Sequence, residues 1–502
     1  MNPLLLTDGY KTSHHLQYPK NTTLVYSNFT PRSNKYAPKG CDKVVSFGQQ
    51  MAVMQIHEAF QKDFFSKPKD EVCSEMKREL EMYLGMEYDV THFEKLHDLG
   101  YLPLEIKAIE EGTLVPMKVP VLTIYNTHRD FFWLTNYLET ILSNLMWKPM
   151  TSATIAHQYK KVLTNWQQKT DKDNGWFIDW QGHDFSMRGL DSVEATISSG
   201  LGHLTSFMGS DSLPTIWGAR KYYNAEGQVA GSVPATEHSV MCSGGKEDEI
   251  STFKRLMETF PKGILSVVSD TWDLWKVLTT YLPQLKEEIL SRDGKLVIRP
   301  DSGDPVDIIC GLNTRDDKSF TSEEIKHPSY KGLVELLWDT FGGTINSQGY
   351  KVLDSHIGAI YGDSITLERA EDICRRLEQK GFASTNIVLG IGSFTYQYNT
   401  RDTFGFAMKA TYIEVSEKAV GRGYDDEITV GIEIFKDPIT DDGTKKSAKG
   451  LMSVYEDDFE VITLYDCQTW EQEKEGMLKT IYRNGEFTKL TTLKEIKERL
   501  NG

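Results

Sequence analysis

The octapeptide from Ile298 to Pro305 combines side chains whose types and spacing could do chemistry. It places an arginine, an aspartate, a serine and a glycine directly after the short run 295–297, which is typical of a buried strand. Arginine suits a phosphate or a polarised ring, aspartate suits sugar hydroxyls or magnesium, and glycine lets backbone N–H groups approach an anion. Polar groups at the end of a strand lie where α/β folds build active sites. A plain Pro-Asp-Ser-Gly turn explains the same residues equally well.

Four further clusters carry polar chemistry, and each of them also has a structural explanation. They are residues 7–11, 183–189, 209–211 and 232–239. They supply carboxylates, a phenol beside a glycine, an aromatic ring near a guanidinium, and a histidine flanked by hydroxyls and a carboxylate. Asp8 or Asp211 could instead cap a helix. Phe185 could belong to the core, and His238 could be a buried, hydrogen-bonded histidine.

The elements that must position these residues follow a regular rhythm between about residues 180 and 400. Short apolar runs end in Gly, Asp or Ser at four places, and helical sequence follows most of them; the runs are 264–268, 296–298, 357–361 and 386–389. Parallel strands joined by helices, with polar groups at one rim, are the pattern of an α/β barrel. Gly and Asp also mark ordinary turns, but four such junctions favour the barrel.

The two ends of the chain have a different character. Residues 1–150 mix short strand-like runs with amphipathic helices, and residues 403–502 return to strand-like runs and end in a charged helix. We therefore expect an α/β fold in which a barrel-like catalytic domain spans residues 151–402. A second, α+β domain is expected from residues 1–150 together with residues 403–502.

Composition excludes several classes of protein. A net charge of −16 argues against a nucleic-acid partner. No apolar run reaches membrane-spanning length, and the N-terminal residues do not resemble a signal peptide, so we expect a cytoplasmic protein without a membrane partner. Six scattered cysteines argue against a disulfide framework or a structural zinc site. The P-loop and G-x-S-x-G motifs are absent.

Taken together, seven ordered segments resemble the nicotinamide phosphoribosyltransferase family, within the type II phosphoribosyltransferases and nearest to its bacterial and phage members. These segments are residues 7–11 with 17–19, 183–189, 232–239, 267–270, 298–305, 362–363 and 400–402. The type I signature, two acidic residues before a Thr-Gly-Gly-Thr loop, is missing. The resemblance implies a barrel-like type II phosphoribosyltransferase domain. It also implies the reaction of nicotinamide with phosphoribosyl pyrophosphate to nicotinamide mononucleotide and pyrophosphate.

The resemblance also implies roles for the residues that bind nicotinamide. Phe185 and Tyr10 match the two positions that stack on the flat pyridine ring, with Tyr10 coming from a second subunit. Asp211 matches the acceptor of the amide N–H, and Ser266 matches a hydroxyl near the amide. Asp8 lies in the same substrate-binding motif as Tyr10.

A second set of residues is implied to bind the ribose, phosphates and metal. Arg299 and Arg188 match positive groups at the substrate and phosphate site. Asp301 and Asp363 match ribose or magnesium contacts with Asp270 beside them, so Asp270 and Asp301 are the expected Mg²⁺ ligands. Backbone N–H groups of Gly362, Gly392 and Ser393 would hold the 5′-phosphate. The basic residues expected to meet phosphates across a homodimer interface are Arg32, Arg401, Lys409 and Lys445.

His238 matches the family's phosphorylated histidine, through which ATP hydrolysis improves substrate binding. The catalytic residues expected are therefore His238, Asp301, Arg299 and Asp270. Two positions depart from the vertebrate pattern: Phe394 follows Gly392–Ser393 where those members have a third glycine, and Leu451 replaces an arginine.

Two other functions remain open from the sequence. Nicotinate phosphoribosyltransferase shares the fold and ribose chemistry, but it must hold a carboxylate that Asp211 would repel. A non-catalytic signalling or binding protein would show decay of the site residues and an export signal, and the sequence has neither feature.

Overall fold

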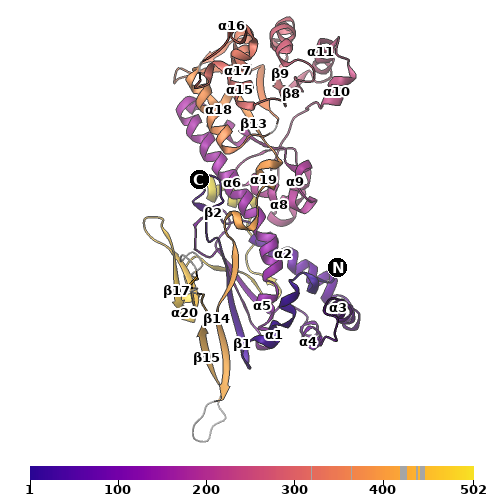
Figure 1. Ribbon diagram of the computed structural model, residues 1–502, viewed down its shortest axis with the longest axis vertical. Helices are drawn as coiled ribbons and strands as arrows, with labels where there is room; N and C mark the ends of the chain where they lie inside the picture. Colours follow the sequence, from indigo (N-terminus) through magenta and orange to yellow (C-terminus); the bar gives the residue numbers. More distant parts are fainter. Residues whose placement is uncertain (318, 363, 419–426, 437–438, 441–446) are drawn as a thin grey trace. The chain divides into compact units, whose positions relative to one another are not determined.

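The computed structural model describes residues 1–317, 319–362, 364–418, 427–436, 439–440 and 447–502 (Figure 1). Its backbone contacts separate two compact units. The terminal unit consists of Met1–Thr154, Ala219–Ala225 and Asn399–Gly502, and the barrel unit consists of Ile155–Gly218 and Glu226–Tyr398. The division into functional domains at residues 150 and 402 stays a prediction.

The barrel unit is built on a six-stranded sheet in which every pair of neighbouring strands is parallel. The order is β7-β6-β13-β12-β9-β8. The strands are β6 (Gly182–Asp184), β7 (Gly209–Ser210), β8 (Lys262–Val268), β9 (Asp293–Arg299), β12 (Ile357–Tyr361) and β13 (Ile387–Ile391). Strands β12 and β13 are almost wholly buried, as parallel strands covered on both faces must be.

An irregular segment, residues 231–236, connects the two edges of this sheet. Gly231 forms a parallel bridge with Gly209 of β7, and Ala235 forms one with Ser266 of β8. The N–H of Ser266 donates to the carbonyl of Pro234 at 2.9 Å, and the N–H of Ser210 donates to that of Gly231 at 3.1 Å. The sheet is therefore curled into a barrel, which confirms the predicted fold class.

Amphipathic helices cover the barrel strands. Helix α18 (Leu367–Gln379) shows why: Ala370, Ile373, Cys374 and Leu377 recur at helical spacing and are all fully buried. They join one large core with the outward-facing side chains of the strands, such as Leu296 and Ile357. Burial of each such aliphatic side chain contributes about 1.5–3 kcal/mol. The other principal helices are α8 (Val193–Leu204), α11 (Glu249–Thr259), α15 (Pro305–Cys310) and α17 (Gly332–Phe341).

The terminal unit contains a seven-stranded antiparallel sheet with the order β15-β14-β1-β5-β3-β18-β19. Its strands are β1 (Thr22–Thr30), β3 (Leu104–Ala108), β5 (Leu122–Asn126), β14 (Ala407–Lys418), β15 (Glu427–Glu433), β18 (Lys479–Arg483) and β19 (Glu486–Phe487). Strand β1 pairs with β14 on one side and with β5 on the other, so segments from both ends of the chain share one sheet. This arrangement confirms the expected α+β fold of these segments.

Helices of the terminal unit pack around a second core. They include α2 (Gln49–Phe60), α3 (Lys69–Leu84), α4 (Thr91–Leu99) and α21 (Leu493–Asn501), and the long helix α6 (Glu139–Thr170) begins in this unit. Phe29, Phe93 and Ile124 are fully buried within that core. Of the helices in the described ranges, none combines the length and apolar character needed to cross a membrane.

Candidate active site

The predicted site residues of the barrel unit follow the carboxyl ends of its parallel strands. Phe185 follows β6, Asp211 follows β7, Asp270 follows β8, Asp301 follows β9, Gly362 follows β12 and Gly392 follows β13. The connecting segment 231–236 leads in the same way to His238. Because all these strands are parallel, their carboxyl ends lie at one rim of the barrel, where α/β folds place their sites.

One end of this rim is organised around Asp211. The Nε2 atom of His183 lies 3.1 Å from Oδ1 of Asp211, and the N–H of Asp211 donates to the carbonyl of Asp184 at 3.0 Å. The rings of His183 and Phe185 are 4.5 Å apart, and the Arg299 guanidinium lies 6.0 Å from the centre of the Phe185 ring. These residues place a carboxylate, an aromatic face and a cation together.

The electrostatic environment keeps Asp211 ionised. Burial opposes its charge, but hydrogen bonds from His183 and Ser232 and the positive charge of Arg299 outweigh burial, so the pKa of Asp211 lies below its ordinary value. An ionised carboxylate can only accept hydrogen bonds. Asp211 therefore favours a ligand that donates an N–H and disfavours a second carboxylate.

Ser266 provides a buried hydroxyl on β8. The residue is 4% exposed, and within the described ranges its Oγ atom has no hydrogen-bond partner. Its backbone is held on both sides by the segment 231–236. Since buried polar atoms are normally paired, this hydroxyl is available to a ligand.

Asp270 and Asp301 form an acidic pair next to the Arg299 strand end. Oδ2 of Asp270 accepts the N–H of Asp301 at 2.8 Å and the hydroxyl of Ser302 at 2.6 Å. Within the part of the chain that the structure describes, the buried Oδ1 of Asp270 has no partner. His238 lies beside the pair, with Nε2 at 3.8 Å from Oδ2 of Asp301 and Nδ1 at 3.2 Å from the hydroxyl of Thr271.

This acidic pair fits a magnesium ion. Mg²⁺ is usually bound by one or two carboxylates together with water and substrate phosphates, not by a full cage of protein ligands. The free Oδ1 of Asp270 and the half-exposed Asp301 match that need. Among the described residues, no group of three His, Cys, Asp or Glu side chains could hold a metal by itself.

Glycines bring backbone close to this acidic pair. A Cβ atom at Gly362 would lie 2.5 Å from Oδ1 of Asp301, so a larger residue here would displace that carboxylate. Gly189 packs in the same way against the side chain of Ser393. Gly392 is buried and precedes the short helix α19 (Ser393–Gln397), whereas Arg188 is exposed in the turn Met187–Gly189. Asp363 lies outside the described residues.

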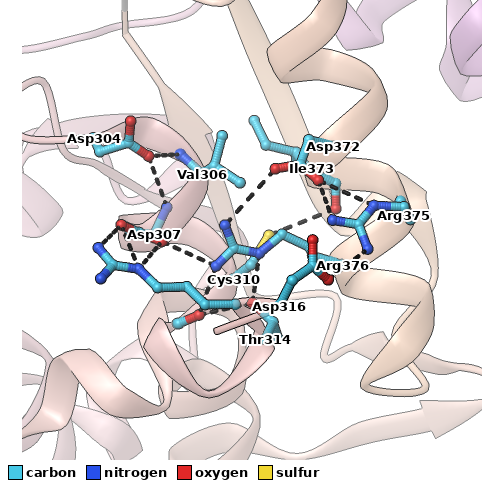
Figure 2. Close-up of polar contacts among 12 residues, drawn as sticks. Asp304, Val306, Asp307, Cys310, Thr314, Asp316, Asp372, Ile373, Arg375 and Arg376 are labelled. Carbon is cyan, nitrogen blue, oxygen red and sulfur yellow. Dashed lines mark hydrogen bonds and ion pairs between the residues drawn. The ribbon is translucent and has the colours of Figure 1, made fainter. Parts of the chain in front are cut away.

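A network of ion pairs holds the segment that follows Arg299 (Figure 2). Asp304 caps helix α15 by accepting the N–H groups of Val306 and Asp307. Arg376 of α18 donates to Asp307 at 2.9 Å and to the hydroxyl of Thr314 at 2.6 Å. Arg376 is 5% exposed, so α15 and the turn after it are anchored to α18 by a buried charge.

The remaining predicted residues belong to the terminal unit. Asp8 accepts a hydrogen bond from the hydroxyl of Thr140 at 2.7 Å, and the side chain of Tyr10 is exposed. Arg32 donates to the carbonyl of Gly405 at 2.8 Å, and Arg401 is exposed beside Asp402. Lys445 lies outside the described residues. In the single chain, the predicted residues thus form one set at the barrel rim and another set in the terminal unit.

The basic residues of the terminal unit influence each other. Burial and the nearby charge of Arg401 lower the pKa of Arg32. Burial also lowers the pKa of Lys409, and the positive charges of Arg32, Lys11 and Lys436 add to that effect against Glu139. Mutual repulsion of this kind would be relieved by a bound anion.

The structure adds residues to which the sequence assigned no role. His183 and Ser232 both bind Asp211, Ser302 binds Asp270, and Thr271 binds His238. One signal could have found His183: it stands two residues before Phe185, and in extended backbone residues at that spacing share a face. The others depend on contacts between distant loops.

Solved structures with a similar fold cover almost the whole chain. The chain is similar in structure to a nicotinate-nucleotide pyrophosphorylase from Pyrococcus furiosus, with a TM-score of 0.52, 14% identity and coverage of 99% of this chain and 95% of that one. It is also similar to human nicotinic acid phosphoribosyltransferase, with a TM-score of 0.53, 15% identity and coverage of 98% and 92%. The barrel therefore has the fold of the type II phosphoribosyltransferases.

Sequence similarity identifies the family within that class. The model of the nicotinate phosphoribosyltransferase (NAPRTase) family matches residues 180–486, and that of the nicotinamide phosphoribosyltransferase N-terminal domain matches residues 2–106. The chain is 50% identical over 512 residues to nicotinamide phosphoribosyltransferase of Acinetobacter baylyi, with coverage of 100% of this chain and 97% of the relative. It is 36% identical over 474 residues to that of Mycoplasma pneumoniae, with coverage of 89% and 94%. The chain belongs to the nicotinamide phosphoribosyltransferase family.

Proposed function

We propose that this protein transfers the phosphoribosyl group of phosphoribosyl pyrophosphate to nicotinamide, releasing pyrophosphate and forming nicotinamide mononucleotide for NAD salvage. The observation that carries the proposal is the ionised Asp211, held by His183 next to Phe185 and Arg299. A carboxylate in that place accepts the amide N–H of nicotinamide, while the aromatic face stacks on its electron-poor ring. The buried hydroxyl of Ser266 would complete recognition of the amide.

The ribose and phosphates would occupy the rest of the rim. Asp301 and Asp270 lie where ribose hydroxyls or magnesium would bind, and the backbone at Gly362 and Gly392 would approach the 5′-phosphate. Magnesium bound by Asp270 and Asp301 would neutralise charge on the leaving pyrophosphate. Arg299 and Arg188 would stabilise the same anions, and Asp363 would join them as a ribose or metal contact.

The chemistry needs orientation more than proton transfer. Cleavage of the bond between C1 of the ribose and pyrophosphate leaves positive charge on the sugar, and the pyridine nitrogen forms the new bond to C1 with inversion. That nitrogen carries a lone pair and no proton, so no general base is required. Asp211 and Phe185 would align the nitrogen with C1, which is how positioned reactants gain most of their rate.

His238 would couple ATP to this reaction. Its ring is half exposed, and Thr271 contacts its Nδ1 atom. In the proposed step a ring nitrogen takes the γ-phosphoryl group of ATP and releases ADP, and water later cleaves the phosphohistidine to inorganic phosphate. Oδ2 of Asp301 lies 3.8 Å from Nε2 of His238, so the added negative charge would repel this carboxylate.

The working unit in this proposal is a homodimer with two shared sites. The exposed ring of Tyr10 would stack on the nicotinamide bound at the partner's barrel rim. Asp8, in the same motif as Tyr10, would come with it, and the basic residues Arg32, Arg401, Lys409 and Lys445 would meet the phosphates. The repulsion between Lys409 and the neighbouring positive charges supports the proposal that an anion binds beside Lys409.

Nicotinate phosphoribosyltransferase is the second candidate, because family members with that activity share the barrel. The ionised Asp211 argues against it, since nicotinate would place a second carboxylate beside the first. The test is an assay of purified protein with magnesium, phosphoribosyl pyrophosphate and either base. Equal or better use of nicotinate would overturn the proposed substrate.

A further inference from the structure

A buried hydrogen-bonded chain runs behind the barrel rim. Tyr396 lies on α19, three residues after Ser393, and its hydroxyl is 2.8 Å from Nδ1 of His203. His203 lies near the end of α8, and its Nε2 is 2.9 Å from the carbonyl oxygen of Gly209. Both side chains have 0% exposure, so water does not compete for these bonds.

The direction of each bond follows from the groups involved. A carbonyl oxygen can only accept, so Nε2 of His203 must carry a hydrogen and donate it to Gly209. In the neutral ring Nδ1 then has a lone pair and accepts the O–H of Tyr396. The geometry therefore selects one tautomer of His203.

The two ends of this chain lead to different parts of the proposed site. Gly209 stands two residues before Asp211 on β7, and the N–H of Asp211 is itself bonded to β6. Tyr396 belongs to the helix that starts at Ser393, and the backbone N–H of Ser393 is proposed to bind the 5′-phosphate. The hydrogen bonds from Tyr396 through His203 to Gly209, which we call the relay, thus connect the rim near Asp211, where the pyridine ring would bind, with the rim near Ser393, where the 5′-phosphate would bind.

A neighbouring tyrosine reaches only the phosphate end. The hydroxyl of Tyr159 donates to the carbonyl of Ile365 at 2.7 Å, and the hydroxyl of Thr395 lies 3.1 Å from it. Because the hydrogen of Tyr159 is used on Ile365, Thr395 donates to the tyrosine oxygen. Tyr159 therefore joins Thr395 of α19 to the backbone of Ile365.

We propose that Tyr396 and His203 are positioning residues that fix the separation between Asp211 and the backbone of Ser393. Neither residue touches substrate. Because they bond to β7 before Asp211 and to α19 after Ser393, they would keep the two binding positions at the distance that a base and a phosphoribosyl group need when both are bound. This inference rests on the proposed function, since it assigns nicotinamide to the Asp211 end and the 5′-phosphate to the Ser393 end.

Kinetics of three tyrosine-to-phenylalanine variants test the relay. Tyr396→Phe should raise the KM for nicotinamide and that for phosphoribosyl pyrophosphate about three- to tenfold each, with kcat changed less than about twofold. Tyr159→Phe should raise only the KM for phosphoribosyl pyrophosphate. The matched control is Tyr482→Phe, which removes a buried Tyr–His bond of 3.2 Å in the terminal unit and should leave both KM values unchanged. Unchanged KM values in Tyr396→Phe, or equal changes in the control, would overturn the relay.

Replacement of His203 separates positioning from simple packing. His203→Gln keeps one donor and one acceptor, whereas His203→Leu fills the space with neither. We expect the Gln variant to retain KM values within about threefold of wild type. The KM values of the Leu variant should rise at least as much as those of Tyr396→Phe. Equal kinetics of the two variants would show that only packing matters.

A spectroscopic readout separates failure of the relay from failure of the proposed function. Long-range ¹H–¹⁵N spectra of protein labelled at histidine, with His203→Gln to assign the signal, should show His203 as the Nε2–H tautomer. The Nδ1–H tautomer would overturn the relay even in an active enzyme. Wild-type protein inactive with nicotinamide would overturn the proposed function, while an Nε2–H tautomer whose Nδ1 resonance shifts in Tyr396→Phe would still support the relay.

Discussion

Nε2 of His183 and Oδ1 of Asp211 lie 3.1 Å apart, and this contact orients the carboxylate that we propose distinguishes an amide from an acid. His183 lies on β6 and Phe185 directly follows that strand, so one short segment supplies both the residue that holds Asp211 and the aromatic face. The contact also helps to keep the pKa of Asp211 low against the opposing effect of burial.

Asp211→Asn should weaken discrimination against nicotinate. Asparagine removes the negative charge and adds an N–H donor, so a second carboxylate is no longer repelled. We expect the ratio of kcat/KM for nicotinamide to that for nicotinate to fall by at least about tenfold, which corresponds to about 1.4 kcal/mol. Steady-state assays with both bases give the ratio, and an unchanged ratio would remove Asp211 from substrate selection.

Gly362→Ala should damage the ribose and metal end of the site. The new Cβ would lie 2.5 Å from Oδ1 of Asp301 and would push that carboxylate away from Asp270. We expect kcat/KM for phosphoribosyl pyrophosphate to fall at least about tenfold, because small displacements of positioning groups are costly. Gly175→Ala is the control, since its Cβ would meet only one side-chain atom, at 3.7 Å. Full activity of Gly362→Ala would contradict the placement of Asp301.

His238→Ala should abolish the coupling to ATP. In the wild-type protein we expect ATP to leave an acid-labile phosphate on the chain and to lower the KM for the substrates. Both effects should vanish in the variant, because no other group is proposed to accept the phosphoryl group. His356→Ala should keep both effects, since His356 pairs with Asp354 just before β12, at the opposite end of the strand from the rim. ATP stimulation that persists in His238→Ala would exclude the coupling role.

Mixed dimers should reveal shared sites. Tyr10→Ala and Arg299→Ala should each be nearly inactive, but co-refolded together they should regain about one quarter of wild-type activity, because one site of each mixed dimer carries neither change. A mixture of Phe185→Ala with Arg299→Ala is the control and should stay inactive, since both changes lie on the barrel unit. No recovery among demonstrated mixed dimers, or a fully active monomer in light scattering, would refute the shared-site proposal.

Arg376→Met should destabilise the barrel unit in a pH-dependent way. Burial opposes the charge of Asp307, but hydrogen bonds from Arg315 and Arg376 outweigh it and lower its pKa. The stability that this carboxylate contributes is therefore present above its unfolded pKa of about 3.9 and is lost as the pH falls through the lower folded value. At pH 7 the variant should lose about 3 kcal/mol, and the difference from wild type should shrink below about pH 4.

Urea unfolding at several pH values measures this effect. Arg375→Met is the matched control, because Arg375 pairs with Asp372 and Asp316 at the surface of the same helix (Figure 2). It should cost less than about 1 kcal/mol. Equal losses in both variants would show that the buried network has no special weight.

The sequence by itself determined the class of fold and the chemistry of each rim segment. Parallel barrel strands are buried runs that end abruptly in polar residues, and the segments around Asp270, Arg299 and Gly362 have that form. The ordered resemblance to nicotinamide phosphoribosyltransferases rests on the same segments, and the comparisons confirm the family. Roles assigned to single residues, including Asp363 and Lys445, stay predictions.

Only the tertiary structure decided which of these segments meet. The segment 231–236 has no strand pattern, yet it bridges β7 and β8; His203 lies near the end of a helix, yet it bonds to Gly209 and Tyr396. Strand β1 pairs with β14, almost 400 residues further along the chain. Periodicity reports how one element is buried, whereas pairing between distant elements depends on the packing of the whole core, which no local pattern contains.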